Sequence, residues 1–344
     1  MTPRGTDWSL AALVALLAVT GGLTALAGSP GGEWVFAVHG AGGFALAGVL
    51  AFKARRVWQR LLRPRRWQGR ARAGVLAAAL VAATLASGWA WSSGATPRAA
   101  GYNLLNLHVV LGVVLALGVL AHALVRARRP RRADVADRRQ FLTAAAIAGG
   151  SLVGWQIQRP VQRALGWRGA ERRFTGSYPA TGFPETSWVA DRPRPLGDAY
   201  RLTVTGAVRR PLTLTAAELD RGDTLTATLD CTGGFYVTPL WRGVALATLL
   251  DRAGASGDHV RVVSHTGYRW SFTADAARGF LLATHVADKP LSHGHGAPAR
   301  LVAPGRRGLE WVKWVTRIEV ADGPDLGAAA STVWSSFTPQ GRGA

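Results

Sequence analysis

The chain has 344 residues, enough for about two domains, and 48% of them are hydrophobic, which favours membrane segments over a wholly soluble protein. Its formal net charge of +21 would suggest nucleic-acid binding if it were spread over a soluble face. The charge is instead concentrated, with nine cations at 53–72 and seven at 126–139. Both groups lie between apolar runs, which predicts cytoplasmic loops and no nucleic-acid partner.

Four apolar runs long enough to cross a bilayer are predicted within residues 1–130, at 8–27, 34–52, 73–91 and 102–125. With the N-terminus inside, both basic segments fall on the cytoplasmic side, so the runs form an up-and-down bundle with consistent topology. The sequence therefore predicts an all-α transmembrane module in a bacterial plasma membrane, in contact with membrane lipid.

Two histidines lie at similar predicted depth in this module. His39 is five residues into the second run and His108 is near the start of the fourth, and both runs pass from outside to inside. Ionisable residues within a span are usually functional, and a histidine pair on different helices suits axial ligation of a haem iron. The module would then be a cytochrome b-like domain. The alternative is that the histidines hydrogen-bond across helices or reach the interface. No histidine lies at the matching position of the second run to pair with His122, so His122 is assigned either to a quinone site or to the inner membrane interface.

The segment 131–158 contains Arg138 and Arg139, followed by Phe141, Leu142 and an apolar run at 144–155. This pattern is typical of a twin-arginine export signal placed inside a chain. The alternative is a basic loop that ends before a fifth span. Under either interpretation the fifth helix carries the chain outward, and without a clear cleavage site it stays as an anchor. Residues 159–182 are then a linker, and the domain after this linker is extracytoplasmic.

The predicted outer domain, 183–322, is α+β and mostly β. Period-2 patterns predict strands at 200–208, 224–230, 259–265, 268–273, 280–286, 299–303 and 311–320. Short helices are predicted at 215–218, by its capping-box spacing, and at 244–253, closed by Gly254. Residues 323–344 are a tail rich in Gly, Ala and Ser.

Cys231 is the only cysteine, and two glycines follow it closely. It is expected where a strand ends and the chain turns, where a thiolate can reach a bound metal. The alternative is a free, buried cysteine that acts as a small apolar residue.

Residues 295–305 read His-Gly-Ala-Pro-Ala-Arg-Leu-Val-Ala-Pro-Gly, and 312–314 read Val-Lys-Trp. This resembles the pterin-binding segment of the sulfite oxidase family of molybdoenzymes, which includes the bacterial methionine-sulfoxide reductase catalytic subunits. The resemblance covers about 180–322 and implies a sulfite-oxidase-like fold with molybdopterin. It implies that Cys231 ligates molybdenum and that His295, Arg300 and Lys313 hold the pterin and its phosphate. Taken singly, Arg300 could be a solvated strand residue, Lys313 an edge-strand cation and His295 part of a surface pair with His293.

The chain departs from sulfite oxidases directly after the cysteine. Those enzymes carry arginines there that help to bind an oxyanion, whereas residues 232–237 read Thr-Gly-Gly-Phe-Tyr-Val, which argues against sulfite as the substrate. His265 and Tyr268 lie in a segment that approaches the active site in the resembled family, so they are candidate catalytic residues that line the pocket.

Together these features predict a membrane-anchored molybdopterin oxidoreductase that transfers oxygen atoms to or from a small-molecule or protein partner. It would exchange electrons with the quinone pool through a haem b. Two alternatives stay open: a non-catalytic membrane binding or assembly protein, and an electron-transfer cytochrome without metal chemistry in its outer domain.

Overall fold

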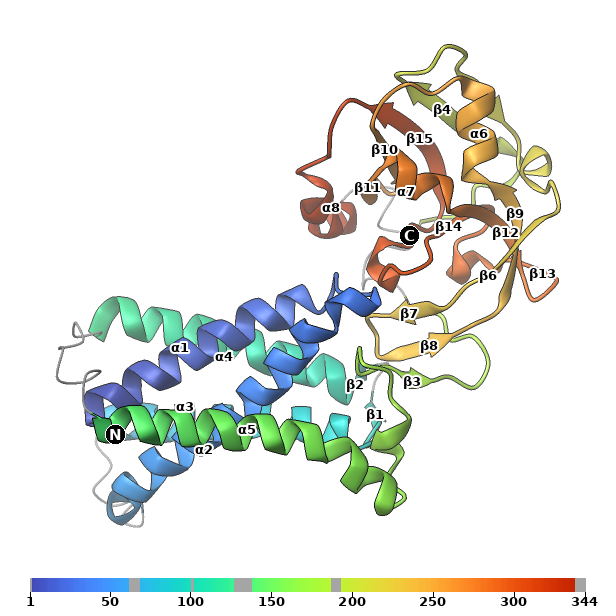
Figure 1. Ribbon diagram of the computed structural model, residues 1–344. Coiled ribbons are helices and arrows are strands. Elements are labelled where there is room, and N and C mark those ends of the chain that lie inside the picture. Colours follow the sequence, from blue (N-terminus) through green and yellow to red (C-terminus); the bar gives the residue numbers. More distant parts are fainter. Residues whose placement is uncertain (1, 62–68, 100–101, 127–137, 187–192, 338–344) are drawn as a thin grey trace. The chain divides into compact units, whose positions relative to one another are not determined.

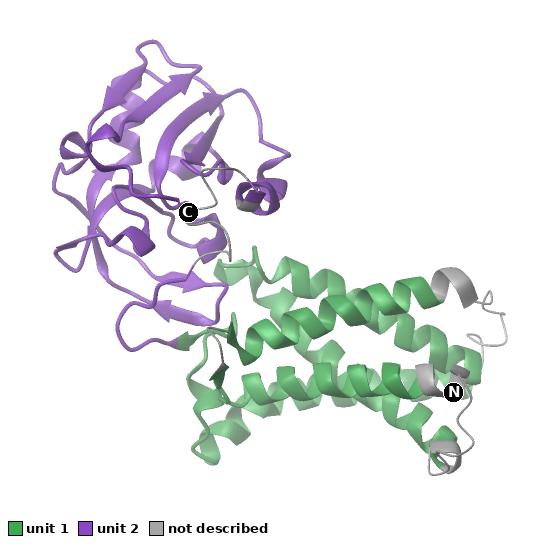
Figure 2. Ribbon diagram, turned by 180° about the vertical axis from the view of Figure 1, so that it is seen from behind, with its two compact units in different colours: residues 1–178 green, residues 179–344 purple. Residues whose placement is uncertain are grey.

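The computed structural model describes residues 2–61, 69–99, 102–126, 138–186 and 193–337. The chain divides into two units, Met1–Tyr178 and Pro179–Ala344 (Figure 2). The boundary lies a few residues before position 183, where the outer domain is predicted to begin. The predicted order, an N-terminal helical module followed by a mostly β domain, is confirmed.

The described residues of unit 1 form five long helices (Figure 1): α1 (Pro3–Leu23), α2 (Glu33–Leu61), α3 (Gly69–Ser92), α4 (Leu104–Arg126) and α5 (Arg138–Ala164). Four stretches are long and apolar enough to cross a membrane, namely Pro3–Leu23, Pro30–Trp58, Gly74–Ser92 and Leu104–His122. These coincide with the four predicted runs. α5 is also helical but is not one of those stretches in the described chain, so its membrane crossing stays a prediction.

Within unit 1, α1 packs against α2 and α4, α2 against α5, and α3 against α4. The apolar core between the helices is small, and its buried members are Val14, Leu46, Val81 and Leu115. Other large apolar side chains, such as Val19 and Leu117, point outward and are more than half exposed, at 62% each. Lipid tails are as apolar as these side chains, so this outward-facing pattern suits helices surrounded by a bilayer.

After α5 the chain folds back onto the helix ends of unit 1. Arg172 is buried and donates hydrogen bonds to the carbonyl of Ser92 (2.8 Å) and the side-chain oxygen of Gln162 (2.6 Å). The Tyr178 hydroxyl donates to the carbonyl of Trp91 at 2.6 Å. The segment predicted as a linker from 159 onward therefore begins with the last turns of α5, and the remainder is fixed against the end of α3. A short pairing of β1 (Arg98–Ala99) with β2 (Tyr102–Asn103) completes this unit.

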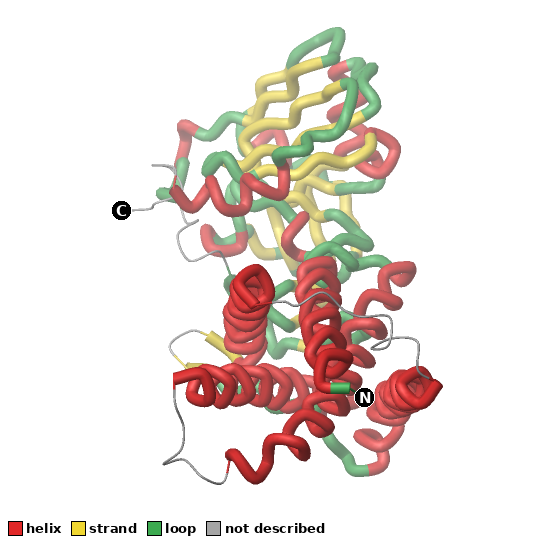
Figure 3. Tube along the Cα trace, turned by 90° about the vertical axis from the view of Figure 1, so that its left-hand side faces the viewer, coloured by secondary structure: helices red, strands yellow, loops and turns green. Residues whose placement is uncertain are grey.

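Unit 2 is mostly β (Figure 3, yellow). One sheet has the order β11 (Arg269–Thr273), β10 (His259–Ser264), β15 (Val315–Ala321), β4 (Leu202–Gly206) and β5 (Leu212–Leu214). β15 and β4 are parallel, whereas the other neighbours are antiparallel. β15, the last strand in the described part of the chain, is thus the central strand of this sheet.

A second sheet has the order β13 (Lys289–Pro290), β12 (Leu281–Val286), β9 (Leu240–Ala245) and β6 (Asp223–Thr226), and β14 (Arg300–Val302) also pairs with β12. β7 (Leu229–Cys231) and β8 (Phe235–Val237) form a hairpin, and β3 (Tyr178–Pro179) lies at the unit boundary. The helices are α6 (Leu246–Ala253), α7 (Ala274–Arg278) and α8 (Ala328–Trp334). The core buries large side chains from both sheets, among them Leu202, Trp241, Leu282, Leu301 and Ile318.

Several local predictions hold. Gly254 closes α6 in the left-handed conformation, with φ of 63°. At the predicted capping box, the backbone N–H and hydroxyl of Thr215 both donate to the Glu218 carboxylate at 2.8 Å, although the helix is only the 3-10 turn Ala217–Leu219.

Other local predictions are wrong in detail. The strand predicted at 224–230 is two strands, β6 and β7, with different partners. The strand predicted at 311–320 begins only at Val315, because Trp314 has a left-handed backbone with φ of 52° and interrupts the extended chain. β5, β8 and β9 were not predicted. The helix predicted at 244–253 begins only at Leu246, because Val244 and Ala245 are the last residues of β9.

The segment predicted as a tail contains α8, which packs on β11. The Ser331 hydroxyl accepts the backbone N–H of Arg269 at 3.0 Å, and the Asp325 carboxylate accepts from Arg269 Nε at 2.5 Å. These contacts extend the folded domain beyond position 322.

Candidate functional site

Cys231 ends β7 and is buried, with 9% of its surface exposed. Its Sγ atom lies 3.3 Å from the backbone nitrogen of Gly233 and 3.3 Å from the Thr186 hydroxyl. The turn after it is closed by the Gly234 N–H, which donates to the Cys231 carbonyl, and Gly234 has φ of 86°. On the other side Gly308 packs so closely that a Cβ there would lie 2.9 Å from the Cys231 Cα. The sulfur is therefore held in a fixed position on a rigid hairpin.

Arg300 lies in β14 and is only 3% exposed, so it is not a solvated strand residue. Its guanidinium carbon lies 5.6 to 5.8 Å from the centroids of three aromatic rings, those of Trp241, Phe183 and Trp311. Burial lowers the pKa of Arg300 to about 10, and the negative charge of a Cys231 thiolate acts in the opposite direction, so the group stays cationic at neutral pH.

The Arg300 guanidinium is not fully used by the protein. Nη1 donates to the carbonyl of His295 at 3.2 Å, whereas the buried Nε has no hydrogen-bond partner among the described residues. A buried donor that makes no hydrogen bond destabilises the folded protein by about 1–3 kcal/mol. An anionic or carbonyl-bearing ligand next to Arg300 would satisfy it.

His295 is held by three contacts. Its ring stacks on Phe183 with centroids 4.0 Å apart, its Nε2 donates to the Phe183 carbonyl at 3.0 Å, and its Nδ1 lies 2.9 Å from the Ser292 hydroxyl. Burial lowers the pKa of His295, more than the Phe183 carbonyl and the Glu185 carboxylate raise it. Because a carbonyl oxygen can only accept, Nε2 carries a proton.

Lys313 Nζ donates to the carbonyls of Thr186 and Gly294, and it lies 5.5 Å from the centroid of the Trp314 ring. The left-handed backbone of Trp314 turns the chain directly after the lysine. The Trp314 indole N–H donates to the carbonyl of His293 at 2.9 Å and holds this turn.

One short segment contacts all four of these residues. In this 183–186 strap, Phe183 stacks on His295 and lies under Arg300, and Thr186 contacts both Cys231 and Lys313. The Glu185 carboxylate accepts a hydrogen bond from Ser292 at 2.5 Å. None of the strap residues was predicted as a site residue, because nothing in the pattern of 185–186 marks contacts with positions about 45 to 127 places away.

A buried ion pair lies directly beside the cysteine. The Arg307 guanidinium donates to the Asp230 carboxylate, and the two residues are 4% and 3% exposed. The Arg307 backbone N–H donates to the Glu310 carboxylate at 3.3 Å, and burial raises the pKa of that carboxyl. Residues 232–237 carry no cation, but Arg307, from a later segment, brings one to the residue before Cys231, and the sequence did not reveal this contact.

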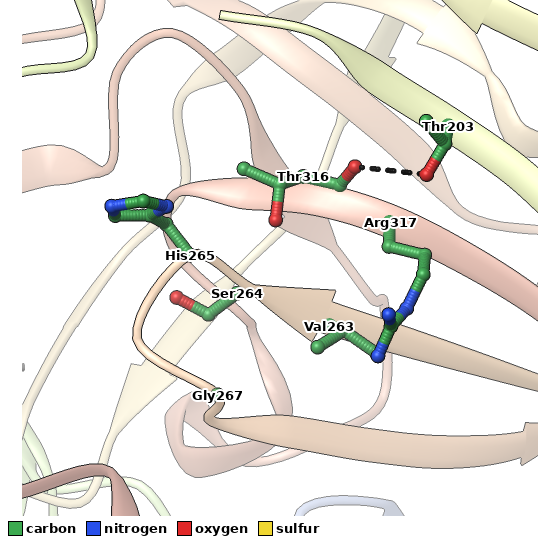
Figure 4. A pocket seen from close by; sticks show the side chains of 7 residues that line it. All are labelled: Thr203, Val263, Ser264, His265, Gly267, Thr316 and Arg317. Atoms are coloured by element: carbon green, nitrogen blue, oxygen red, sulfur yellow. Dashed lines mark hydrogen bonds between the residues drawn. The ribbon is translucent and has the colours of Figure 1, made fainter. Parts of the chain in front are cut away.

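The structure places His265 and Tyr268 in the turn between β10 and β11. His265 lines a pocket of about 320 Å³ at the ends of β10 and β15, shown in Figure 4 with its other lining residues, Thr203, Val263, Ser264, Gly267, Thr316 and Arg317. The Tyr268 hydroxyl accepts from the Trp270 indole at 2.8 Å and donates to the Leu309 carbonyl. These two hydrogen bonds hold the Tyr268 hydroxyl in place. The catalytic roles of His265 and Tyr268 stay predictions.

In unit 1, His39 and His108 do lie together. Their ring centroids are 6.2 Å apart, with the planes at 90°. His39 Nδ1 is 3.1 Å from the Thr20 hydroxyl, and His108 Nδ1 is 3.0 Å from the Thr84 carbonyl. The Thr20 hydroxyl itself donates to the Leu16 carbonyl, so it accepts from His39. Both rings therefore carry their proton on Nδ1, which leaves Nε2 as the atom able to ligate a metal.

Comparison with known proteins finds similar sequences for part of unit 2. A family model described as "Oxidoreductase molybdopterin binding domain" matches residues 190–328. Nitrate reductase [NAD(P)H] of Hordeum vulgare is 31% identical over 162 residues, which cover 36% of this chain and 18% of that protein. Mitochondrial sulfite oxidase of Drosophila melanogaster is 34% identical over 95 residues, covering 24% of this chain and 17% of that protein.

Among solved structures, the sulfane dehydrogenase SoxCD of Paracoccus pantotrophus is similar, with 30% identity, a TM-score of 0.35, and coverage of 37% of this chain and 39% of that one. The chain spans less than a fifth of the length of these two curated relatives. All of the matched family region lies in unit 2.

Proposed function

Because residues 190–328 are an oxidoreductase molybdopterin-binding domain, homologous to the molybdenum domains of sulfite oxidase and nitrate reductase, we propose that the chain is a membrane-anchored enzyme of oxygen-atom transfer. One observation carries the proposal. Cys231, His295, Arg300 and Lys313 come from four separate segments and all contact the 183–186 strap.

The donor set of this cluster fits molybdopterin. Cys231 offers a soft thiolate of the kind that ligates transition metals. Arg300 and Lys313 offer cations for a phosphate, and the orphaned Arg300 Nε offers one more N–H donor. When bound, the cofactor supplies two-electron oxygen-transfer chemistry. The protein positions it, while the rings of Phe183, Trp241 and Trp311 keep water away from the guanidinium.

For the membrane unit, we propose a haem b held by Nε2 of His39 and of His108. The two rings lie close together, each Nδ1–H has an oxygen acceptor, and such a second hydrogen bond fixes the tautomer of a ligating histidine. Electrons would pass through this haem to or from a membrane quinone. The basic segments at 53–72 and 126–139 support a cytoplasmic location for their loops and an extracytoplasmic location for unit 2.

The charges near Cys231 bear on the class of substrate. Residues 232–237 carry no cation, and the guanidinium of Arg307, which lies next to Gly308 in the chain, is engaged by Asp230. This supports a substrate other than sulfite, and a small-molecule or protein oxygen-atom donor or acceptor fits the proposal.

The test is metal analysis together with a visible spectrum of the detergent-purified chain. Molybdenum near one per chain with a reducible b-type haem band supports the linked enzyme. Iron without molybdenum points to an electron-transfer or assembly protein, and molybdenum without haem removes the assignment of His39 and His108. As a matched variant, Cys231→Ser should abolish oxygen-atom transfer and leave the haem spectrum unchanged. Activity that survives this substitution would refute the molybdenum assignment.

A further inference from the structure

The Cys231 sulfur is in contact with a hydroxyl group from outside its own hairpin. The Thr186 hydroxyl lies 3.3 Å from Sγ, at the same distance as the Gly233 backbone nitrogen. Gly233 is two residues from the cysteine and belongs to its turn, whereas Thr186 is 45 residues earlier in the chain. The contact therefore depends on the tertiary placement of the 183–186 strap.

Thr186 is fixed from two sides. Its carbonyl accepts a hydrogen bond from Lys313 Nζ, and its hydroxyl faces Cys231. The strap is fixed further by the stacking of Phe183 on His295 and by the Glu185 carboxylate, which accepts from Ser292. The contacts of the strap therefore fix the backbone of Thr186 and, with it, the position of the hydroxyl.

The chemistry of a ligating thiolate gives this contact a direction. A thiolate has no proton and can only accept, so Thr186 would donate to it. Hydrogen bonds to a metal-bound sulfur withdraw electron density from the metal and are among the factors that set its reduction potential.

We propose that Thr186 is a positioning residue whose hydroxyl raises the reduction potential of the metal held by Cys231, with Lys313 holding the strap in place. This inference rests on the proposed molybdenum function. It adds a residue that tunes the ligand and does not itself touch the substrate.

The test compares four full-length, detergent-purified proteins: the wild type, Thr186→Val, Thr186→Ser and Thr228→Val. Valine keeps the shape and the backbone carbonyl of residue 186 but removes its hydroxyl, and serine restores a hydroxyl. Thr228 pairs with the Thr238 hydroxyl at 2.9 Å on the exposed part of the same unit and serves as the control. The readout is the midpoint potential from a potentiometric titration of the molybdenum electron paramagnetic resonance signal.

The expected result is a more negative potential for Thr186→Val, with Thr186→Ser and Thr228→Val close to the wild type. The inference is overturned if Thr186→Val titrates at the wild-type potential, or if serine shifts the potential as much as valine does. It is also overturned if Thr186→Val alone loses molybdenum, because the hydroxyl would then serve retention and not tuning. A wild-type protein without molybdenum would instead refute the proposed function, so the two failures are distinguishable.

Discussion

The Arg307 guanidinium donates to the carboxylate of Asp230, the residue directly before Cys231, and both side chains are almost completely buried. The same two residues also form an isolated parallel β-bridge. Backbone and side chain thus tie the loop before Gly308 to the strand that carries the cysteine.

Replacement of Arg307 by Met should strongly destabilise unit 2. It removes the cation that compensates a buried carboxylate, and breaking a buried pair in this way costs about 3–5 kcal/mol. Thermal unfolding followed by tryptophan fluorescence would measure this as a lower midpoint. Arg278→Met is the control, because both side chains of its ion pair with Asp251 are exposed, at 45% and 64%. Equal midpoints for the two variants would contradict the role given to the pair.

Arg300→Met should cost the protein its molybdenum. A charged hydrogen bond contributes roughly 1.5–3 kcal/mol, or about tenfold or more in affinity. Arg300→Lys should recover only part of the loss, since an ammonium cannot reproduce the planar fork enclosed by three rings. Elemental analysis after purification would test this, with Arg278→Met as a control on an exposed residue paired with Asp251. Wild-type molybdenum in Arg300→Met would exclude a role for this group in cofactor retention.

His108→Gln should abolish the b-type absorption bands while molybdenum per chain stays unchanged, since the two cofactors are assigned to different units. His122→Gln is the matched control on the same helix, where the residue is exposed. If the spectrum survives in His108→Gln but is lost in His122→Gln, the haem ligands have been assigned to the wrong histidine.

His295 should make unit 2 less stable as the solution becomes acidic. Burial lowers its pKa in the folded state, so its contribution is fully present above the unfolded value of about 6.5 and declines as the pH falls below it. The unfolding midpoint of unit 2 should therefore fall between about pH 7 and pH 5. In His295→Asn this dependence should be weaker. The raised pKa of Glu310 acts in the opposite direction, but it is present in both proteins and cancels in the comparison. Parallel pH profiles would argue that another group is responsible.

Gly254→Ala should destabilise unit 2 by about 1 kcal/mol, because Gly254 has φ of 63° and alanine rarely adopts this conformation. Gly279→Ala is a useful comparison. Gly279 also follows a helix, but its φ is −81° and a Cβ there would meet its nearest atom at an ordinary 3.5 Å. The unfolding midpoint should fall clearly only in the first variant, and an equal fall in both would show that helix termination is not the cause.

The features that were predicted well depend on residues that are close together in the sequence. The membrane runs depend on local apolarity, and the capping of α6 depends on a single glycine at the right place. His295, Arg300 and Lys313, which were predicted to hold a pterin, belong to two nearby motifs in the sequence, and in the structure all three contact the 183–186 strap.

The features that were missed depend on contacts between distant segments. Thr186 approaches Cys231 from 45 positions away, and Arg307 approaches Asp230 from 77 positions away. Neither position has a local pattern that distinguishes it from a loop residue. The same is true of the break before Val315, since the left-handed backbone of Trp314 is held by a hydrogen bond to His293 and not by its own preference.

The central position of β15 has a consequence for how the protein is made. β15 lies between β10 and β4 and pairs in parallel with β4, which is more than a hundred residues earlier in the chain. This sheet cannot close until residue 321 has left the ribosome, whereas the helices of unit 1 need only local contacts to form. The helices of unit 1 are therefore synthesised and available for membrane insertion before this sheet of unit 2 can close.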